Sequence, residues 1–148
     1  MSKYQTGLST ALITGASEGI GRCFAEVYAK NAHNLVLVAR SEQKLTDFAL
    51  ELSTKYAVNV DVIAMDLIPV DAARKLFEIT AAKDLKIDIL VNNAGMMQVE
   101  KLNVSDPIKL NNLIQLNVQS LVNMTQQFIN PMIARGKGKI VNVGSIAS

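Results

Sequence analysis

Short apolar runs alternate with longer amphipathic stretches along this chain. Five runs rich in β-branched residues have the length of strands, at residues 9–14, 34–39, 59–64, 87–91 and 139–143. Four stretches with apolar residues at helical spacing lie near or between them, at residues 20–31, 41–56, 70–84 and 105–134. The near-continuous hydrophobicity of the short runs indicates strands that are buried on both faces. Their alternation with helices predicts right-handed crossovers and an α/β fold with a doubly wound parallel sheet.

Composition narrows the class of protein without locating a site. The chain has 148 residues and no internal repeat or linker, so we expect one domain over residues 1–148. Its hydrophobic content of 49% is sufficient for a packed core, and its net charge of +2 gives no reason to expect a nucleic-acid partner. The densest basic stretch, residues 135–139, is diluted by glycines, and we interpret it as a solvated turn.

Cysteine usage and hydropathy indicate a cytoplasmic protein. The single cysteine, Cys23, excludes an internal disulfide and supplies no metal cluster, so no metal site is expected. Because Cys23 lies one turn into a predicted helix beside Phe24 and Val27, we expect a buried structural thiol. No apolar run approaches the roughly 18 residues of a membrane span, and the first residues do not have the pattern of a signal peptide.

A glycine-rich loop follows the first predicted strand. Gly15, Gly19 and Gly21 stand between that strand and an amphipathic helix. Glycines there give a tight turn and close backbone approach to a pyrophosphate, and the helix N-terminus presents free N–H groups to the anion. Three glycines alone could form only a turn, but at this junction they predict a Rossmann-like dinucleotide site. Arg22 and Cys23 replace the Lys-Ser/Thr pair of nucleoside triphosphatases, which disfavours a kinase or ATPase.

Four further motifs follow the loop in order: Asp66-Leu67, Asn92-Asn93-Ala94-Gly95, Asn117 and Ile140-Val141-Asn142-Val143-Gly144-Ser145. With them, the chain resembles the short-chain dehydrogenase/reductase family, in its shorter, single-domain branch. The resemblance covers essentially the whole chain but only the front part of the family's length, which is roughly 250 residues. We therefore expect the sheet to end after about the fifth strand and the family's C-terminal portion to be lacking.

The resemblance implies roles for individual residues. Around the cofactor's phosphates and ribose it places Gly15, Ser17, Gly19, Ile20 and Gly21. Asp66 would lie beside the adenine ring, followed by Leu67. Support of the central sheet and lining of the cofactor cleft would come from Asn92, Asn93, Ala94 and Gly95. In the chemistry itself, Asn117 would position a water of the proton relay and Ser145 would hydrogen-bond the substrate oxygen.

Each of these residues also has a plain structural interpretation. Asp66 could be a turn or helix-capping residue, and Asn92-Asn93 could form a turn because asparagine tolerates left-handed backbone. Asn117 could be one satisfied polar group on a helix, and Ser145 a turn residue at a strand end. Their joint order along the chain favours the functional interpretation.

The end of the second predicted strand bears on the choice of nicotinamide cofactor. It carries no carboxylate that would bind the ribose hydroxyls, and Arg40 stands where a guanidinium could bind a 2′-phosphate. These features favour NADP over NAD. Two observations weigh against this choice: Glu18 stands where many NADP-preferring relatives carry a basic residue, and Arg40 could simply face solvent.

By resemblance, the chain is an NAD(P)-dependent oxidoreductase that transfers hydride between NADP(H) and a small-molecule carbonyl or alcohol. In the family a tyrosine, assisted by a lysine one helical turn beyond it, handles the proton after the serine. Only three residues follow Ser145, and neither Tyr4, Tyr28 nor Tyr56 has a lysine four residues on. We therefore expect the chain to be inactive alone, and its intact form to be a homo-oligomer. If the protein truly ends at Ser148, the alternative is a catalytically incomplete cofactor-binding or interaction module; a sugar-nucleotide epimerase fits the glycine spacing less well.

Overall fold

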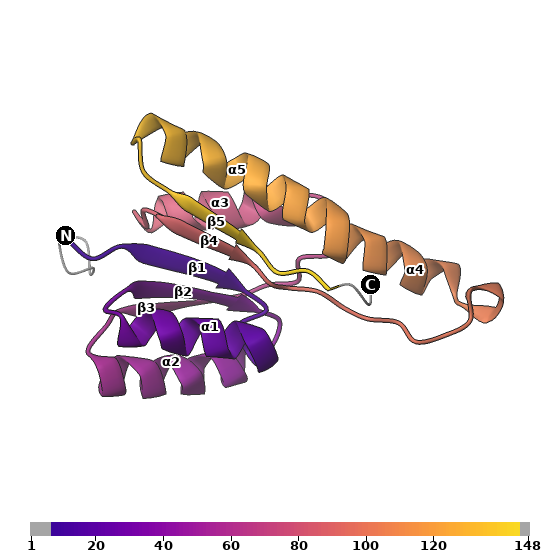
Figure 1. Ribbon diagram of the computed structural model, residues 1–148, viewed down its shortest axis with the longest axis horizontal. Helices are drawn as coiled ribbons and strands as arrows, with labels where there is room; N and C mark the ends of the chain where they lie inside the picture. The colour runs from indigo at the N-terminus through magenta and orange to yellow at the C-terminus, as the bar shows by residue number, and fades with distance from the viewer. Residues whose placement is uncertain (1–6, 146–148) are drawn as a thin grey trace.

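The computed structural model describes residues 7–145 (Figure 1). Its strands are β1 (Thr10–Thr14), β2 (Asn34–Ala39), β3 (Val60–Ala64), β4 (Ile89–Asn92) and β5 (Lys139–Asn142). Its α-helices are α1 (Gly19–Lys30), α2 (Glu42–Tyr56), α3 (Ala72–Ala82), α4 (Pro107–Ile114) and α5 (Leu121–Ala134). The five strands and the first three helices confirm the predicted elements, with small shifts at their ends.

The strands form one five-stranded parallel sheet in the order β3-β2-β1-β4-β5. Helices α1 and α2 cover one face of the sheet, and α3 and α5 cover the other (Figure 1). The predicted doubly wound architecture is therefore confirmed. From β1 the sheet grows through β2 to β3, and the chain then crosses back so that β4 pairs with the other side of β1. This reversal between β1 and β4 is the point at which sheets of this kind bind ligands, outside the carboxyl ends of the strands.

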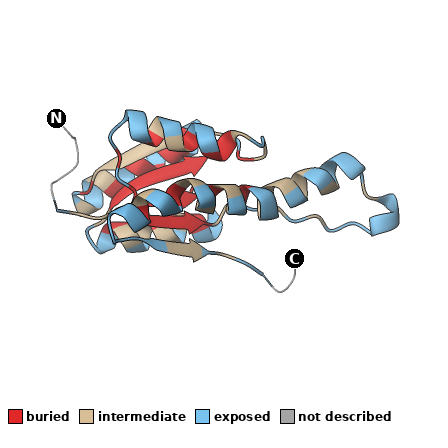
Figure 2. Ribbon diagram, turned by 90° about the horizontal axis from the view of Figure 1, so that it is seen from above, coloured by how far each residue is buried: buried red, intermediate tan, exposed pale blue. Residues whose placement is uncertain are grey.

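The core is divided by the sheet into two apolar layers. Along β1, Ala11 and Ile13 pack toward α1 and α2, whereas Leu12 packs toward α3 and α5. Every residue of β1, β2 and β4 is buried, which explains the near-continuous hydrophobic runs in the sequence (Figure 2). The edge strand β5 is half-buried or exposed along its length.

The structure divides the segment predicted as one helix over residues 105–134. After the 3-10 turn η1 (Leu102–Val104), α4 leads into a π-helical turn, η2 (Gln115–Ser120), and then into α5. A π turn carries an extra residue, so it changes which side chains face the sheet without ending the helix. The loop after β4 and helix α4 extend beyond the carboxyl end of the sheet (Figures 1 and 2). Within residues 7–145, no helix is both long and apolar enough to cross a bilayer.

The prediction of a buried Cys23 is wrong, because this residue is exposed. The buried face of α1 consists of Gly21, Ala25 and Ala29, which recur every four residues. Cys23 lies outside this stripe, and Val27 is also exposed. The small residues allow α1 to approach the sheet closely, and Phe24 and Tyr28 pack half-buried against the same core, which leaves Cys23 on the exposed side.

Candidate functional site

Two cavities lie at the carboxyl end of the sheet and share the residues Asn93, Ala94, Gly95 and Met96. The first has a volume of about 380 Å³ and is bordered by the glycine loop and by the segments after β2 and β3. The second has a volume of about 460 Å³ and is bordered by α1, the π turn and the segment after β5. Because both are lined by the residues directly after β4, they adjoin at the predicted edge, and we refer to them together as a groove with two compartments.

The glycine loop forms part of the wall of this groove. Gly15 and Gly19 have positive φ angles of +65° and +55°, in the left-handed region that favours glycine. A Cβ atom on Gly21 would overlap the carbonyl oxygen of Gly15, so the helix can approach the loop only with glycine at this position. Ser17 lines the first compartment and Ile20 the second, whereas Gly19 and Gly21 shape the loop without lining either one.

Thr14 and Asn93 connect the glycine loop to the end of β4. The buried Thr14 hydroxyl donates to the Val91 carbonyl (3.2 Å) and accepts from the backbone N–H groups of Asn93 (3.0 Å) and Ala94 (2.9 Å). In return, the Asn93 amide donates to the carbonyls of Thr14 (3.0 Å) and Gly15 (3.3 Å). The sequence analysis did not identify Thr14, although a hydroxyl residue at the junction of strand and glycine loop was a visible signal.

Asn92 performs a different structural task from its neighbour. Its side chain donates to Thr125 Oγ1 (3.2 Å) and to Asn142 Oδ1 (3.0 Å), which links β4 to α5 and β5. Neither Asn92 nor Asn93 has a positive φ angle, so the alternative of a left-handed asparagine turn is wrong. Asn92 instead fastens α5 and β5 to the end of β4, and Asn93 fastens the glycine loop to the same strand end.

Asn117 lies in the π turn and clamps the loop that follows β4. Its Oδ1 accepts from the Met96 N–H (2.9 Å), and its Nδ2 donates to the Met96 carbonyl (2.8 Å). Its side chain is therefore a satisfied polar group, as the structural interpretation expects, and it also lines the second compartment. Gly95 lies beside it, where a Cβ atom would be 3.3 Å from Asn117 Oδ1.

The first compartment collects charged residues from three elements. Arg40, exposed at the end of β2, lines it together with Asp66, Leu67 and Lys44. Asp66 Oδ1 accepts from the backbone N–H of Ile68 (3.0 Å), so Asp66 is a turn residue and a lining residue at once. The next residue, Leu67, is buried. Lys44 was not identified from the sequence, although a basic residue four positions after Arg40 was visible there.

Ser145 is exposed and lines the second compartment with Val143 and Gly144. The structure therefore brings Ser145 and Asn117 to the same cavity, from the segment after β5 and from the π turn. The fifth strand ends at Asn142, and the three residues that follow it reach the groove. Among residues 7–145, no cluster of histidine, cysteine and carboxylate side chains could hold a metal ion.

Comparisons with known proteins agree with this geometry. A family model described as short chain dehydrogenase matches residues 9–148. The very-long-chain 3-oxoacyl-CoA reductase of Homo sapiens is 36% identical over 139 residues, which are 91% of this chain and 44% of that protein. The chain thus spans less than half of that relative's length.

Two solved structures are similar in both sequence and fold. A short-chain dehydrogenase from Sphingobium yanoikuyae in complex with NADPH has a TM-score of 0.87 and 37% identity, with 94% of this chain and 54% of that one covered. The L-sorbose reductase from Gluconobacter frateurii, complexed with NADPH and L-sorbose, has a TM-score of 0.88 and 34% identity, with 99% and 55% covered.

Proposed function

The chain belongs to the short-chain dehydrogenase family, and from this premise we propose that it forms the cofactor-binding part of an NADP-dependent oxidoreductase. The substrate would be a small molecule with a carbonyl or alcohol group. The observation that carries the proposal is the two-compartment groove at the switch point of the sheet, with the glycine loop at its wall. The NADPH-bound relatives support the choice of cofactor.

The residues present fit a dinucleotide. Gly15 and Gly21 pack closely and carry no side chain, which leaves the backbone of the loop open to a pyrophosphate. Glu18, the N-cap residue of α1, makes no side-chain capping bond, and the first turn of α1 contains no acidic residue. The N–H groups at this helix end therefore remain suited to an anion.

We propose that the first compartment takes the adenosine half of NADP. Arg40 would bind the 2′-phosphate, because a guanidinium matches the geometry of phosphate oxygens and no carboxylate ends β2. Asp66 and Leu67 would lie beside the adenine, and Ser17 near the phosphates. NAD, which has no 2′-phosphate, would bind more weakly.

The second compartment would take the nicotinamide and the substrate. When bound, the nicotinamide supplies or accepts the hydride. We propose that Ser145 donates a hydrogen bond to the substrate oxygen and that Asn117 positions the proton relay. Both residues line this compartment, which supports their joint role.

The proton donor of the reaction is not assigned to a tyrosine of this sequence. Tyr28 lies on α1 and Tyr56 on α2, and neither lines a compartment of the groove. Tyr4 lies outside the described residues, and none of the three is followed by a lysine four positions later. We therefore propose that these 148 residues bind the cofactor but do not complete the catalytic site alone. The comparisons favour the cofactor-binding part of an oxidoreductase over a non-catalytic interaction module.

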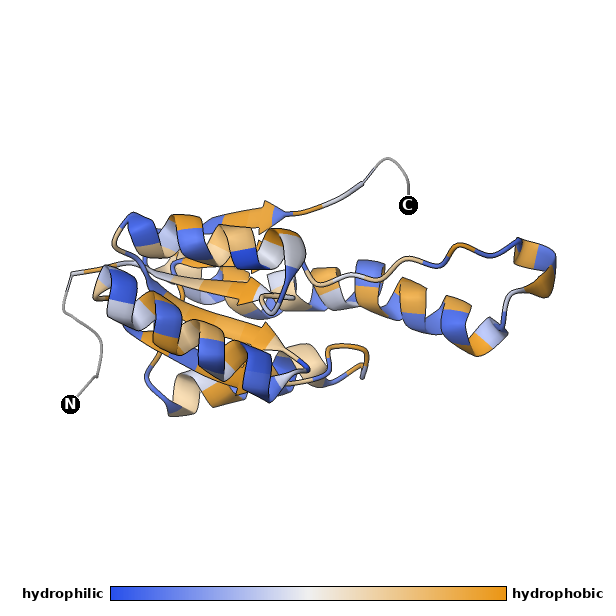
Figure 3. Ribbon diagram, turned by 90° about the horizontal axis from the view of Figure 1, so that it is seen from below, coloured by the Kyte–Doolittle hydropathy of each residue, from blue (hydrophilic) through white to orange (hydrophobic). Residues whose placement is uncertain are grey.

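Exposed apolar side chains support the proposal of a homo-oligomer. They lie along α4, the π turn and α5, where hydrophobic and hydrophilic positions alternate (Figure 3), and include Ile108, Ile114, Val118, Val122 and Ile133. Large exposed apolar side chains gathered on one element are typical of association surfaces. Sedimentation of the intact protein tests this proposal, and a monomer at all concentrations would contradict it.

Fluorescence titration with NADPH and NADH tests the cofactor assignment. We expect saturable binding of both, with NADPH bound more tightly. Equal affinities would contradict the assignment of the 2′-phosphate, and binding of neither would contradict the cofactor site.

In the complete protein, Ser145→Ala should lower the rate of NADPH-dependent carbonyl reduction by about a hundredfold, as expected for a lost hydrogen bond to a developing charge. An unchanged rate would refute the role of Ser145.

A further inference from the structure

An ion pair stands at the rim of the first compartment. Glu18 is the N-cap residue of α1, at the end of the glycine loop, and Lys44 lies in the first turn of α2. Lys44 Nζ is 3.1 Å from Glu18 Oε2. Both residues line the compartment together with Arg40. The first compartment is therefore lined by two cations, Arg40 and Lys44, and by two carboxylates, Glu18 and Asp66.

This arrangement bears on how the rim recognises a phosphate. The two carboxylates would repel an anion, and Arg40 alone would offset only one of their negative charges. Lys44 supplies the second positive charge and comes from α2, whereas the glycine loop supplies only the carboxylate. Its side chain is 61% exposed and that of Glu18 is 76% exposed, so their ion pair is weak and easily exchanged. A phosphate dianion would be a stronger partner for Lys44 than one exposed carboxylate.

Resting on the proposed function, we propose that Lys44 is a specificity-determining residue that binds the 2′-phosphate of NADP beside Arg40. Before binding, Glu18 holds Lys44 at the rim of the compartment, and the phosphate then takes the place of the carboxylate. Glu18 therefore orients the cation and also competes with the ligand. This exchange reconciles an acidic residue in the glycine loop with a preference for NADP.

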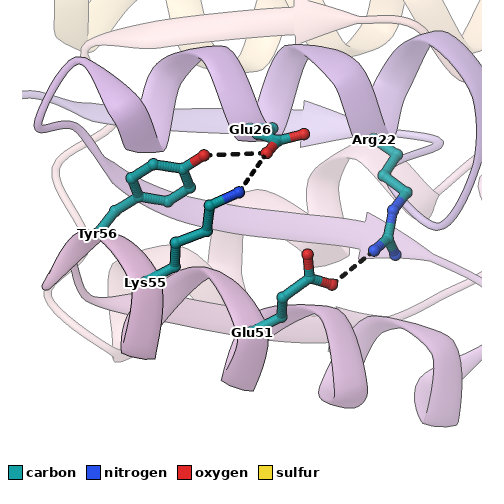
Figure 4. A network of polar contacts seen from close by, with 5 residues as sticks. All are labelled: Arg22, Glu26, Glu51, Lys55 and Tyr56. Carbon is teal, nitrogen blue, oxygen red and sulfur yellow. Dashed lines mark hydrogen bonds and ion pairs between the residues drawn. The ribbon is translucent and has the colours of Figure 1, made fainter.

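A second ion pair in the chain serves as the matched control. Lys55 Nζ is 3.0 Å from Glu26 Oε1, and the pair again joins α2 to α1 (Figure 4). Its lysine is 55% exposed, close to the 61% of Lys44, whereas Glu26 is 47% exposed and Glu18 76%. Neither residue lines a compartment of the groove. The control pair also has a neighbour in Tyr56, whose hydroxyl donates to Glu26 Oε1 (2.9 Å), but it lies away from the groove (Figure 4).

The test compares the affinities of the intact protein for 2′,5′-ADP and 5′-AMP, which differ only in the 2′-phosphate, by calorimetric titration. Lys44→Gln should weaken binding of 2′,5′-ADP about tenfold, as for one lost charge-assisted hydrogen bond, and leave 5′-AMP affinity unchanged. Lys44→Arg should keep the preference. Glu18→Gln should strengthen 2′,5′-ADP binding about threefold by removing a repulsive charge. Lys55→Gln and Glu26→Gln should change neither affinity.

The outcomes separate this inference from the function on which it rests. If the parent protein binds neither nucleotide, the cofactor proposal fails and the inference fails with it. If the parent prefers 2′,5′-ADP and Lys44→Gln keeps that preference while Arg40→Gln loses it, the inference alone is overturned. Equal losses in Lys44→Gln and Lys55→Gln would also overturn it, because the effect would then be one of net charge. Weaker binding by Glu18→Gln would refute the exchange.

Discussion

The hydroxyl of Thr14 makes three hydrogen bonds in a position that is almost inaccessible to water. It donates to one carbonyl of β4 and accepts from two backbone N–H groups just beyond it. A hydroxyl can do both, whereas an apolar side chain of the same shape can do neither. Asn93 and Ala94, which line both compartments, are thus held in place by one oxygen atom.

Replacing that oxygen should therefore cost stability. Thr14→Val keeps the shape but leaves the N–H groups of Asn93 and Ala94 without their partner, and we expect a loss of about 2 kcal/mol. Thr14→Ser keeps the hydroxyl and removes one methyl group, for a loss of about 1 kcal/mol. Urea unfolding of the three proteins provides the measurement. A valine variant as stable as the serine variant would show that the hydroxyl is dispensable.

Gly21 tests the close contact within the glycine loop. In Gly21→Ala the new methyl group meets the backbone of Gly15 and the side-chain nitrogen of Asn93, so the loop or the helix must shift. We expect a destabilisation of about 1–3 kcal/mol together with weaker NADPH binding. The control is Gly144→Ala, because a Cβ atom there has no neighbour within 4 Å. Equal stability of the two variants would contradict the proposed packing.

At the scale of elements, the sequence predicted the strands far better than the long helical segment. Residues 34–39 are apolar at every position but the first, because both faces of β2 are buried, and such a run is unmistakable. Residues 105–134 keep a helical pattern throughout, so nothing in their periodicity revealed the π turn. Within the turn, Asn117 contacts Met96, a tertiary interaction that local patterns do not encode.

The same reasoning applies to the site. Asp66 and Ser145 were proposed from the family resemblance and Arg40 from its place after the second predicted strand. The structure brings all three to one edge, because the carboxyl ends of parallel strands meet there. Lys44 and Thr14 were missed because their importance comes from partners distant in sequence. Cys23 was misplaced because an apolar-looking neighbourhood in the sequence did not identify which stripe of α1 faces the sheet.

The clamp between the π turn and the loop gives a prediction at this scale. Asn117→Ala removes both hydrogen bonds to Met96, and we expect a loss of about 1–3 kcal/mol and faster hydrogen exchange at the Met96 amide. Asn123→Ala serves as the control, since the two hydrogen bonds of this α5 side chain, to the Val70 carbonyl (3.4 Å) and from the exposed Gln119 amide (2.9 Å), do not involve the loop after β4. Unchanged exchange at Met96 would refute the clamp.

At the scale of the whole molecule, the groove joins segments from every strand of the sheet. A ligand that fills both compartments contacts these segments only when they are assembled, so it should stabilise the folded chain as a unit. At a free NADPH concentration of 100 times Kd, the gain is about 2.7 kcal/mol, which corresponds to a rise in Tm of about 5–10 °C. NADH at the same concentration should give a smaller rise. No rise with NADPH would contradict the binding proposal, and differential scanning fluorimetry measures both.

The bonds between Thr14 and Asn93 also set an order of events during synthesis. The two residues are 79 positions apart, so the glycine loop emerges from the ribosome long before its fastening does. Until β4 pairs with β1, the loop has its Ala16–Val38 bond to β2 but lacks its bonds to Asn93 and Ala94, and closing so long a chain segment is slow. Competence to capture a nucleotide is therefore acquired late and all at once. Nascent chains halted before Ala94 should not be retained on an immobilised dinucleotide, and those extended through β5 should be.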